Sequence, residues 1–225
     1  RQRTNNYQQK IITKVAHFTP LPITGQMQPK QIPVYKLKIT DEDPVSGVDY
    51  VALVDVPATE FNWVAFGKQK PFGFTTQNPE QRIICGALMV ANLPIYRKEG
   101  DREYYVVFDK PTIKSVCYKY FRNRFTANVN VMHNPQQKVG GVYMVQSYLV
   151  DKQNGVNAPA FYPELPDGSW FGCFKVDNPQ VWDNYIKTGK LQGFSVEGMF
   201  GQMHVTDASE IIIQQFIEII KNEND

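Results

Sequence analysis

Ser195 is the residue whose setting in this sequence is most suggestive of chemistry. It lies within Leu191-Gln192-Gly193-Phe194-Ser195-Val196-Glu197-Gly198, so a glycine stands on each side of it. Because glycine has no Cβ, the backbone at these positions can turn sharply or approach another strand closely. The pattern is compatible with a presented nucleophile, and also with a strand end that carries an ordinary solvent-facing hydroxyl.

A serine hydroxyl becomes a good nucleophile when a neighbouring base accepts its proton, and histidine has the side chain suited to this task. His133 and His204 lie in the compact part of the chain. His133 follows Val129 and Val131 in an alternating segment, which predicts a strand with all three side chains on one face. It precedes Ser195 by 62 residues (195 − 133), so only tertiary structure can bring the two together. The alternative is a structural histidine at a strand end.

Composition and charge exclude several other classes of protein. The 225-residue chain has a formal net charge of +2, and its Lys and Arg residues form no dense run beside aromatic residues, so nucleic-acid binding is not expected. No apolar stretch approaches the roughly 18 residues that span a bilayer, and no signal peptide is recognisable, so no membrane partner is expected. The sequence is that of an ordinary globular protein.

The three cysteines do not indicate a metal site or a cofactor. Cys85, Cys117 and Cys173 occur in apolar contexts and lack the paired Cys or His spacing of metal sites. Their odd number predicts reduced, buried thiols in a cytosolic setting. Cys173 is not expected to replace Ser195 as a nucleophile, because its strand is apolar and no neighbouring cation would activate its thiol.

Changes in composition predict three regions along the chain. Residues 1–30 are rich in Gln, Asn, Thr and Pro and predict an extended or mobile arm. Residues 31–80 predict a strand-rich extension that ends in a linker, and residues 81–225 predict the main domain.

Within these regions the alternation of apolar and polar residues predicts strands and three helices. The predicted strands cover residues 34–39, 51–58, 83–91, 103–108, 129–133, 141–150, 170–176 and 202–205. The predicted helices begin at Pro111, at Asn178 and after Asp207. The last of them, residues 211–220, is apolar on almost every side and therefore has to be buried in a core or against a partner.

Several runs of the sequence resemble the XkdF-type phage serine proteases. They cover most of residues 34–200 in the same order as in that family. The runs are Ala52–Ala58 with Asn62–Phe66, Leu93–Arg97 before Glu103–Phe108, Asn128–His133, Val142–Leu149, and Trp182 with Lys190–Gly198. This family is similar to the prohead proteases of tailed phages and, more distantly, to the herpesvirus assemblins.

The resemblance implies an α+β fold: a small, mostly antiparallel β-barrel flanked by helices, here with an N-terminal extension. It implies a serine endopeptidase with Ser195 as nucleophile and His133 as general base, working without a cofactor. The expected substrates are scaffold and major capsid protein, cut inside the procapsid in the cytoplasm of an infected bacterium. A homodimer is expected. The sequence departs from the assemblins in having no arginine after Ser195, where those enzymes use arginines near the oxyanion.

Related proteases place an orienting His, Asp or Glu after the serine, and four residues of this chain could fill that role. His204 is favoured because it lies on the next predicted strand, although it could equally be a surface histidine. Asp207 and Glu210 also fit a helix cap, and Glu218 fits a solvated helix edge.

Two further interpretations stay open at the level of sequence. Glu197 lies two residues beyond Ser195, on the same face of a strand, and either shapes the site or is a simple exposed carboxylate. The whole chain could also be a non-catalytic structural protein of the phage head that retains the protease fold, or a binding module that docks through its apolar terminal helix.

Overall fold

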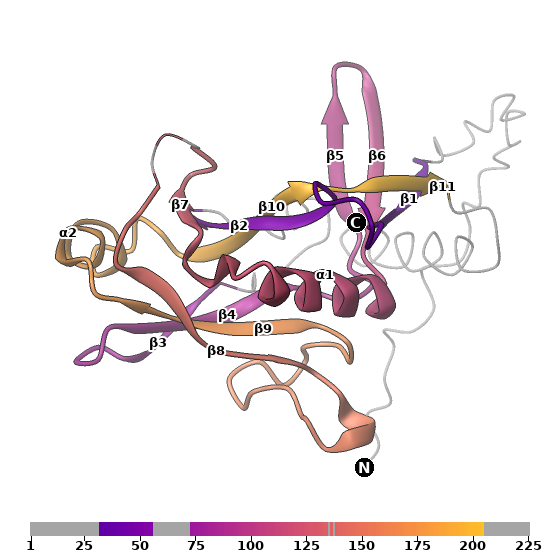
Figure 1. Cartoon of the computed structure of the whole chain (residues 1–225). Helices are drawn as coiled ribbons and strands as arrows, with labels where there is room; N and C mark the ends of the chain where they lie inside the picture. The colour runs from indigo at the N-terminus through magenta and orange to yellow at the C-terminus, as the bar shows by residue number, and fades with distance from the viewer. Residues whose placement is uncertain (1–31, 56–72, 135, 137, 205–225) are drawn as a thin grey trace, which may run out of the picture. The chain divides into compact units, whose positions relative to one another are not determined.

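The computed structural model describes residues 32–55, 73–134, 136 and 138–204 (Figure 1). The predicted arm at residues 1–30 and the predicted terminal helix at residues 211–220 lie outside these residues. So do three candidate orienting residues, Asp207, Glu210 and Glu218.

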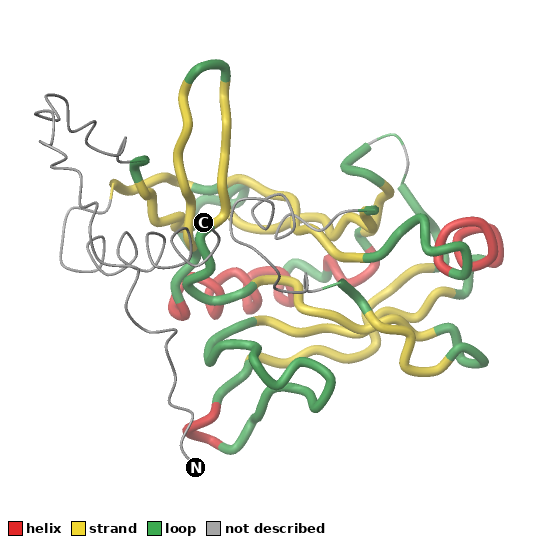
Figure 2. Tube along the Cα trace, turned by 180° about the vertical axis from the view of Figure 1, so that it is seen from behind, coloured by secondary structure: helices red, strands yellow, loops and turns green. Residues whose placement is uncertain are grey.

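The described part of the chain is an α+β structure in which strands predominate over helices (Figure 2). Its strands form three sheets. The first has the order β11 (Gly201–His204), β1 (Val34–Lys38), β6 (Arg102–Val107), β5 (Ile95–Glu99); the second β10 (Gly193–Met199), β2 (Gly47–Val54), β7 (Val129–Val131); the third β3 (Thr75–Asn78), β4 (Ile83–Met89), β9 (Trp170–Val176), β8 (Val142–Leu149).

Most neighbouring strands are antiparallel, as expected, and the exceptions are the parallel pairs β1–β6 and β2–β7. Closing a sheet into a barrel requires its two edge strands to pair. Among the described strands each sheet stays open, with β10 and β7 as the edges of the second sheet. The closed barrel implied by the resemblance is therefore not formed by these strands.

The predicted boundary near residue 80 does not divide the sheets. Strand β1 lies between β11 and β6, and β2 lies between β10 and β7, so both strands of the supposed extension are internal strands. The described residues from 32 to 204 accordingly belong to one compact unit. Local composition missed this because the pairing partners are more than 65 residues away in sequence for every one of these contacts.

Helix α1 (Lys110–Arg122) begins where Pro111 predicts it. The Asp109 carboxylate caps it by accepting from the Thr112 N–H at 2.9 Å. Its buried face, which includes Ile113, Val116, Cys117 and Tyr120, packs between β2 and β9 (Figure 1). The Tyr120 ring meets the Trp170 ring edge-on at 5.2 Å.

The second helical segment differs in detail from its prediction. Asn178 caps α2 (Pro179–Val181) by accepting from the Val181 N–H at 3.1 Å, and a π-helical turn, η3 (Trp182–Ile186), follows. Because a π turn holds more residues than an α turn, it rotates side chains away from the α-helical stripe. Tyr185, which helical spacing would bury together with Val181, Trp182 and Ile186, is 39% exposed.

The third sheet is apolar on both faces. One face contributes Ile84, Trp170 and Phe174 to the main core, and the other forms a second core under the loop of residues 151–169, which contains the short 3-10 helix η2 (Lys152–Asn154). The two central strands of the sheet, β4 and β9, are therefore buried along almost their whole length. A disulfide between β4 and β9 lies within the second core.

The disulfide joins Cys85 to Cys173, so the prediction of reduced thiols is wrong for these two residues. They are directly opposite each other on β4 and β9, with a Cα–Cα distance of 4.1 Å. Their 88-residue separation hides this pairing from the sequence. Cys117 is free and buried, and burial raises the pKa of its thiol to about 12.

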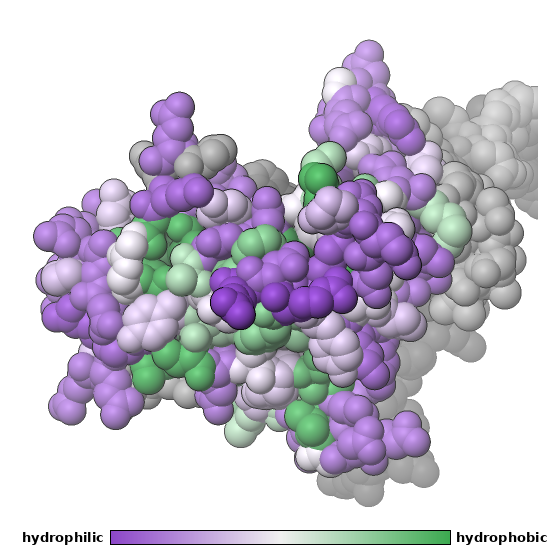
Figure 3. Space-filling model, viewed as in Figure 1, coloured by the Kyte–Doolittle hydropathy of each residue, from purple (hydrophilic) through white to green (hydrophobic). Residues whose placement is uncertain are grey.

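The β5–β6 hairpin projects from the rest of the described chain (Figure 1), and its surface is hydrophilic (Figure 3). Arg102, the first residue of β6 after the turn, places its guanidinium over the rings of Tyr35 and Tyr104, 5.3 and 5.1 Å from their centroids. Within residues 32–204, as far as they are described, no helix is both long and apolar enough to cross a bilayer.

Candidate active site

Ser195 lies in the middle of β10, directly opposite Ala52 of β2. It is 5% exposed, so it is not the solvent-facing hydroxyl that the sequence left open. Its side chain lines a pocket of about 660 Å³. Ser195 is thus reached from the inside of a cavity.

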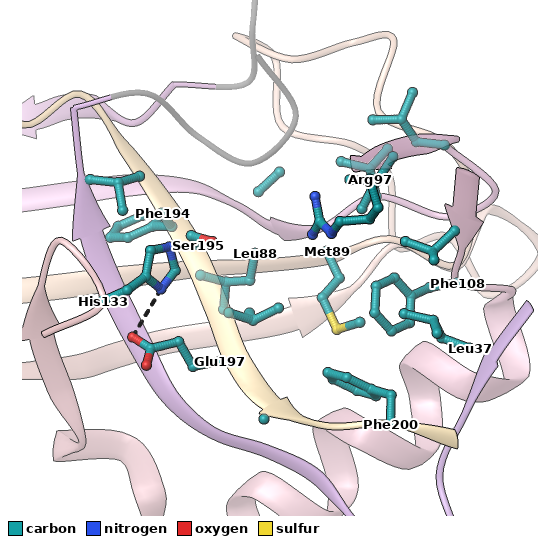
Figure 4. A pocket seen from close by; sticks show the side chains of 18 of the residues that line it. Leu37, Leu88, Met89, Arg97, Phe108, His133, Phe194, Ser195, Glu197 and Phe200 are labelled. Carbon is teal, nitrogen blue, oxygen red and sulfur yellow. Dashed lines mark ion pairs between the residues drawn. The ribbon is translucent and has the colours of Figure 1, made fainter. Parts of the chain in front are cut away.

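The pocket is mostly apolar and lies between β10, β4 and the base of the β5–β6 hairpin (Figure 4). Leu37, Leu88, Met89, Phe108 and Phe200 form much of its wall. Its polar lining is concentrated near Ser195, His133 and Glu197, with Arg97 entering from β5. A mostly apolar cavity with a few convergent polar groups is typical of a binding or catalytic site.

His133 does not continue the strand predicted to carry it. Strand β7 ends at Val131, and the chain then turns through Met132 and His133, closed by a hydrogen bond from the Asn134 N–H to the Val131 carbonyl at 3.1 Å. Both turn residues have positive φ, 54° and 56°, as in a type I′ turn. The turn brings the His133 ring to the pocket that Ser195 lines.

The turn is strained, since the left-handed region suits Gly, Asn and Asp rather than Met and His. Each such residue costs about 1 kcal/mol. Strain of this kind persists where the surrounding structure enforces it and is concentrated at functional sites. The backbone around His133 is therefore a second indication of function, independent of the residue type.

Glu197 is the partner of His133. The Glu197 Oε1 atom lies 3.1 Å from His133 Nδ1, and the two side chains are 24% and 46% exposed. The same oxygen accepts a hydrogen bond of 2.7 Å from Asn130 Nδ2. A carboxylate on Nδ1 holds the ring in one orientation and leaves Nε2 available as a base.

A β-bulge follows Glu197. The register of β10 against β2 shifts between Glu197 and Gly198, and a Cβ on Gly198 would lie only 1.8 Å from the Gly47 carbonyl oxygen. Only glycine allows the two backbones to approach so closely here. Bulges redirect side chains beside active sites, and this one follows directly after Glu197.

Ser195 and His133 line the same pocket, and in Figure 4 the serine side chain lies beside the imidazole ring. No hydrogen bond joins these two described side chains. Hydrogen bonds between catalytic groups are often long in the absence of substrate, and the half-exposed His133 ring has room to move.

His204 lies in a different sheet from Ser195. It is the last residue of β11 and pairs with Tyr35 of β1, whereas Ser195 pairs with Ala52 of β2. Strands β10 and β11 follow one another along the chain, with Phe200 between them (Figure 1). The carboxylate that contacts His133 is instead Glu197, which the sequence could not separate from an exposed surface residue.

Two further residues of the site went unnoticed in the sequence. Asn130 is 1% exposed, and its alternation with Val129 and Val131 on β7 was the only available signal. Arg97 points into the pocket in Figure 4, and its Nη1 donates to the Tyr96 carbonyl at 3.1 Å. Desolvation lowers the pKa of Arg97, but the residue is exposed to solvent and an arginine remains charged at neutral pH.

Glu197 also influences Asp49 of β2. Burial raises the pKa of the Asp49 carboxyl, and the negative charge of Glu197 raises it further. Within the described residues, no three His, Cys, Asp or Glu side chains gather as a metal site would require.

Comparisons with known proteins assign no family to the chain. No protein-family model, no curated protein and no solved structure matches it.

Proposed function

We propose that this protein is a serine endopeptidase in which Ser195 is the nucleophile, His133 the general base and Glu197 the orienting carboxylate. The observation that carries the proposal is the 3.1 Å contact between His133 Nδ1 and Glu197 Oε1, beside a pocket that Ser195 also lines. A nucleophile, a base and an orienting carboxylate around one cavity form the recurring pattern of serine hydrolases.

The reaction follows from these positions. Ser195 Oγ attacks the scissile carbonyl carbon while His133 Nε2 accepts the hydroxyl proton. The imidazolium that forms is stabilised by Glu197 and gives its proton to the leaving amine, which leaves an acyl group on Ser195. Water then attacks the acyl carbon with His133 again as base, releasing the carboxylic acid and restoring the serine.

Arg97 adds positive charge to the lining of the pocket, although the residue is exposed to solvent. The tetrahedral intermediate carries an oxyanion, and a nearby cation stabilises such a charge. Arg97 thus compensates for the arginine that the sequence lacks after Ser195.

The narrower assignment is a capsid-maturation protease of a tailed phage, acting on scaffold and major capsid protein inside the procapsid. It is supported by the order of family-like runs along residues 34–200. On this assignment the protein works in the cytoplasm of the infected bacterium, as a dimer, without a cofactor.

The test is co-expression with the scaffold and major capsid proteins of the same phage, followed by mass spectrometry of the head proteins. We expect cleavage with the wild-type chain and with Ser115→Ala, which changes a serine of α1 outside the pocket. We expect none with Ser195→Ala. Cleavage that persists in Ser195→Ala would refute the proposal.

A second candidate is a structural head protein that retains the site without activity. The missing hydrogen bond between Ser195 and His133 favours this alternative. A fluorophosphonate probe separates the two candidates, because it modifies only a serine that a base has activated. Labelling of Ser195 in the wild-type chain supports the protease, and an unmodified Ser195 supports the structural protein.

A further inference from the structure

We infer that Asn130 is a positioning residue of this site: it holds the Glu197 carboxylate against His133 and thereby selects the ring tautomer that can act as a base. The inference rests on the proposed function. It adds a fourth member to the set of residues on which the activity of Ser195 depends.

The contact is short and lies in a buried place. Asn130 Nδ2 donates to Glu197 Oε1 at 2.7 Å, and Asn130 is 1% exposed. Hydrogen bonds to a charged group are stronger than neutral ones. The partly exposed Glu197 side chain is therefore tied to a rigid strand on the side away from solvent.

The oxygen of the Asn130 amide makes no stabilising contact within the described part of the chain. Asn130 Oδ1 is buried and has no hydrogen-bond partner among the described residues. Leaving a buried acceptor unpaired is unfavourable, and buried polar groups without a partner are uncommon in folded proteins. Rotating the amide by 180° would not help, because Oδ1 would then face the Glu197 carboxylate. A side chain that is costly to bury and has one good contact, to a site residue, points to function rather than stability.

The sheet register explains how Asn130 reaches the site. Ser195, Ala52 and Asn130 lie side by side on β10, β2 and β7, and Glu197 is two residues from Ser195 on the same strand. Because the central residue of this row is an alanine, its small side chain leaves room for the contact between the outer strands. Ser195 and the two residues that position His133, Glu197 and Asn130, thus lie in the same sheet.

Two variants test the role of Asn130, and one control matches them. Asn130→Leu keeps the approximate size and removes the donor, and Asn130→Asp keeps the shape but opposes a carboxylate to Glu197. The control is Asn128→Asp: the Asn128 amide donates to the Asp49 backbone carbonyl at 3.0 Å and has no contact with Glu197. Thermal unfolding establishes which variants fold.

The first readout is the tautomer of His133, from the ¹⁵N shifts of its ring in the full chain. We expect the Nδ1–H form in the wild type and in Asn128→Asp. In both Asn130 variants we expect a mixture with the Nε2–H form. A purely structural role would leave the tautomer of folded variants unchanged, and that result would overturn the inference whether or not the protein is an enzyme.

The second readout is the rate at which a fluorophosphonate modifies Ser195. We expect Asn130→Leu and Asn130→Asp to react about tenfold to a hundredfold more slowly, the range for a lost hydrogen bond to a charged group. A wild-type rate in both folded variants would also overturn the inference. Failure of the proposed function gives a different result, since the wild-type chain itself would then not be modified.

Discussion

The second and third sheets of this protein differ in what they contain: the third is built mainly from apolar side chains, and the second carries polar and strained groups. The third sheet, with β4 and β9 at its centre, is covered by apolar side chains on both faces and stapled by the Cys85–Cys173 disulfide. The second sheet carries a strained turn at Met132 and His133, a bulge after Glu197 and a buried unpaired oxygen on Asn130.

This difference indicates that the second sheet provides the candidate active site and the third sheet provides stability. The strained turn and the unpaired oxygen lie beside Ser195, whereas the third sheet, which has register shifts and a positive φ at Arg82 of its own, carries the disulfide. The third sheet packs against the site through the Phe174–Phe194 ring contact at 5.0 Å. Strain is retained at a site only when the surrounding structure is stable enough to enforce it. Substitutions in the second sheet should therefore change activity, whereas those in the third should affect stability alone.

The largest effect is expected at Glu197. Glu197→Gln should slow fluorophosphonate labelling of Ser195 by about 10⁴-fold, because the new amide donates to Nδ1 and places the ring proton on Nε2, where the base is needed. Stability should be almost unchanged. The control is Glu99→Gln on the hairpin, which removes a carboxylate bonded to Tyr104 and should label normally. Equal rates in the two variants would mean that Glu197 does not orient His133.

The next largest effect is expected at the disulfide. Replacing Cys85 and Cys173 together by Ser should lower the free energy of unfolding by about 4 kcal/mol, because the bond closes a long loop in the unfolded chain. Urea unfolding measures this, and thiol alkylation with mass spectrometry checks the bond itself. The folded double variant should still label at Ser195. Much slower labelling would show that the third sheet contributes to the site, and would contradict the view that it affects stability alone.

A smaller loss of stability is expected at the bulge. Gly198→Ala should cost about 3 kcal/mol, because its Cβ would overlap the Gly47 carbonyl and force β10 away from β2. Labelling should fall as well, since Glu197 moves with the strand. Gly140→Ala is the control, because a Cβ there meets nothing within 4 Å. Urea unfolding of the two variants should differ clearly, and similar values would contradict the close approach of the backbones.

The smallest effect is expected in the turn and has the opposite sign. Met132→Gly should raise the free energy of unfolding by about 1 kcal/mol, because glycine adopts a positive φ without strain. His133→Gly should give a similar gain and abolish labelling. Arg124→Gly provides a reference, since Arg124 has a φ of 60° outside the pocket. A lower free energy of unfolding in His133→Gly would show that the positive φ of His133 does not strain the folded protein.

Much of the local structure could be predicted because it depends on near neighbours. Helix α1 begins where Pro111 predicts, and β9 coincides with the apolar run at residues 170–176. The predictions failed where geometry departs from a regular period. The π turn exposes Tyr185, and the turn after Val131 takes His133 out of its strand.

The sequence by itself determined where most of the strands and helix α1 lie, and it singled out Ser195 and His133 as candidates, because periodicity and residue chemistry are local properties. Only the tertiary structure decided that Glu197 contacts His133, that Asn130 supports Glu197 and that Cys85 meets Cys173. Each of these contacts depends on strand register and on the bulge before Gly198. Register is set by pairing between distant segments, and a shift of one residue would turn every side chain to the other face.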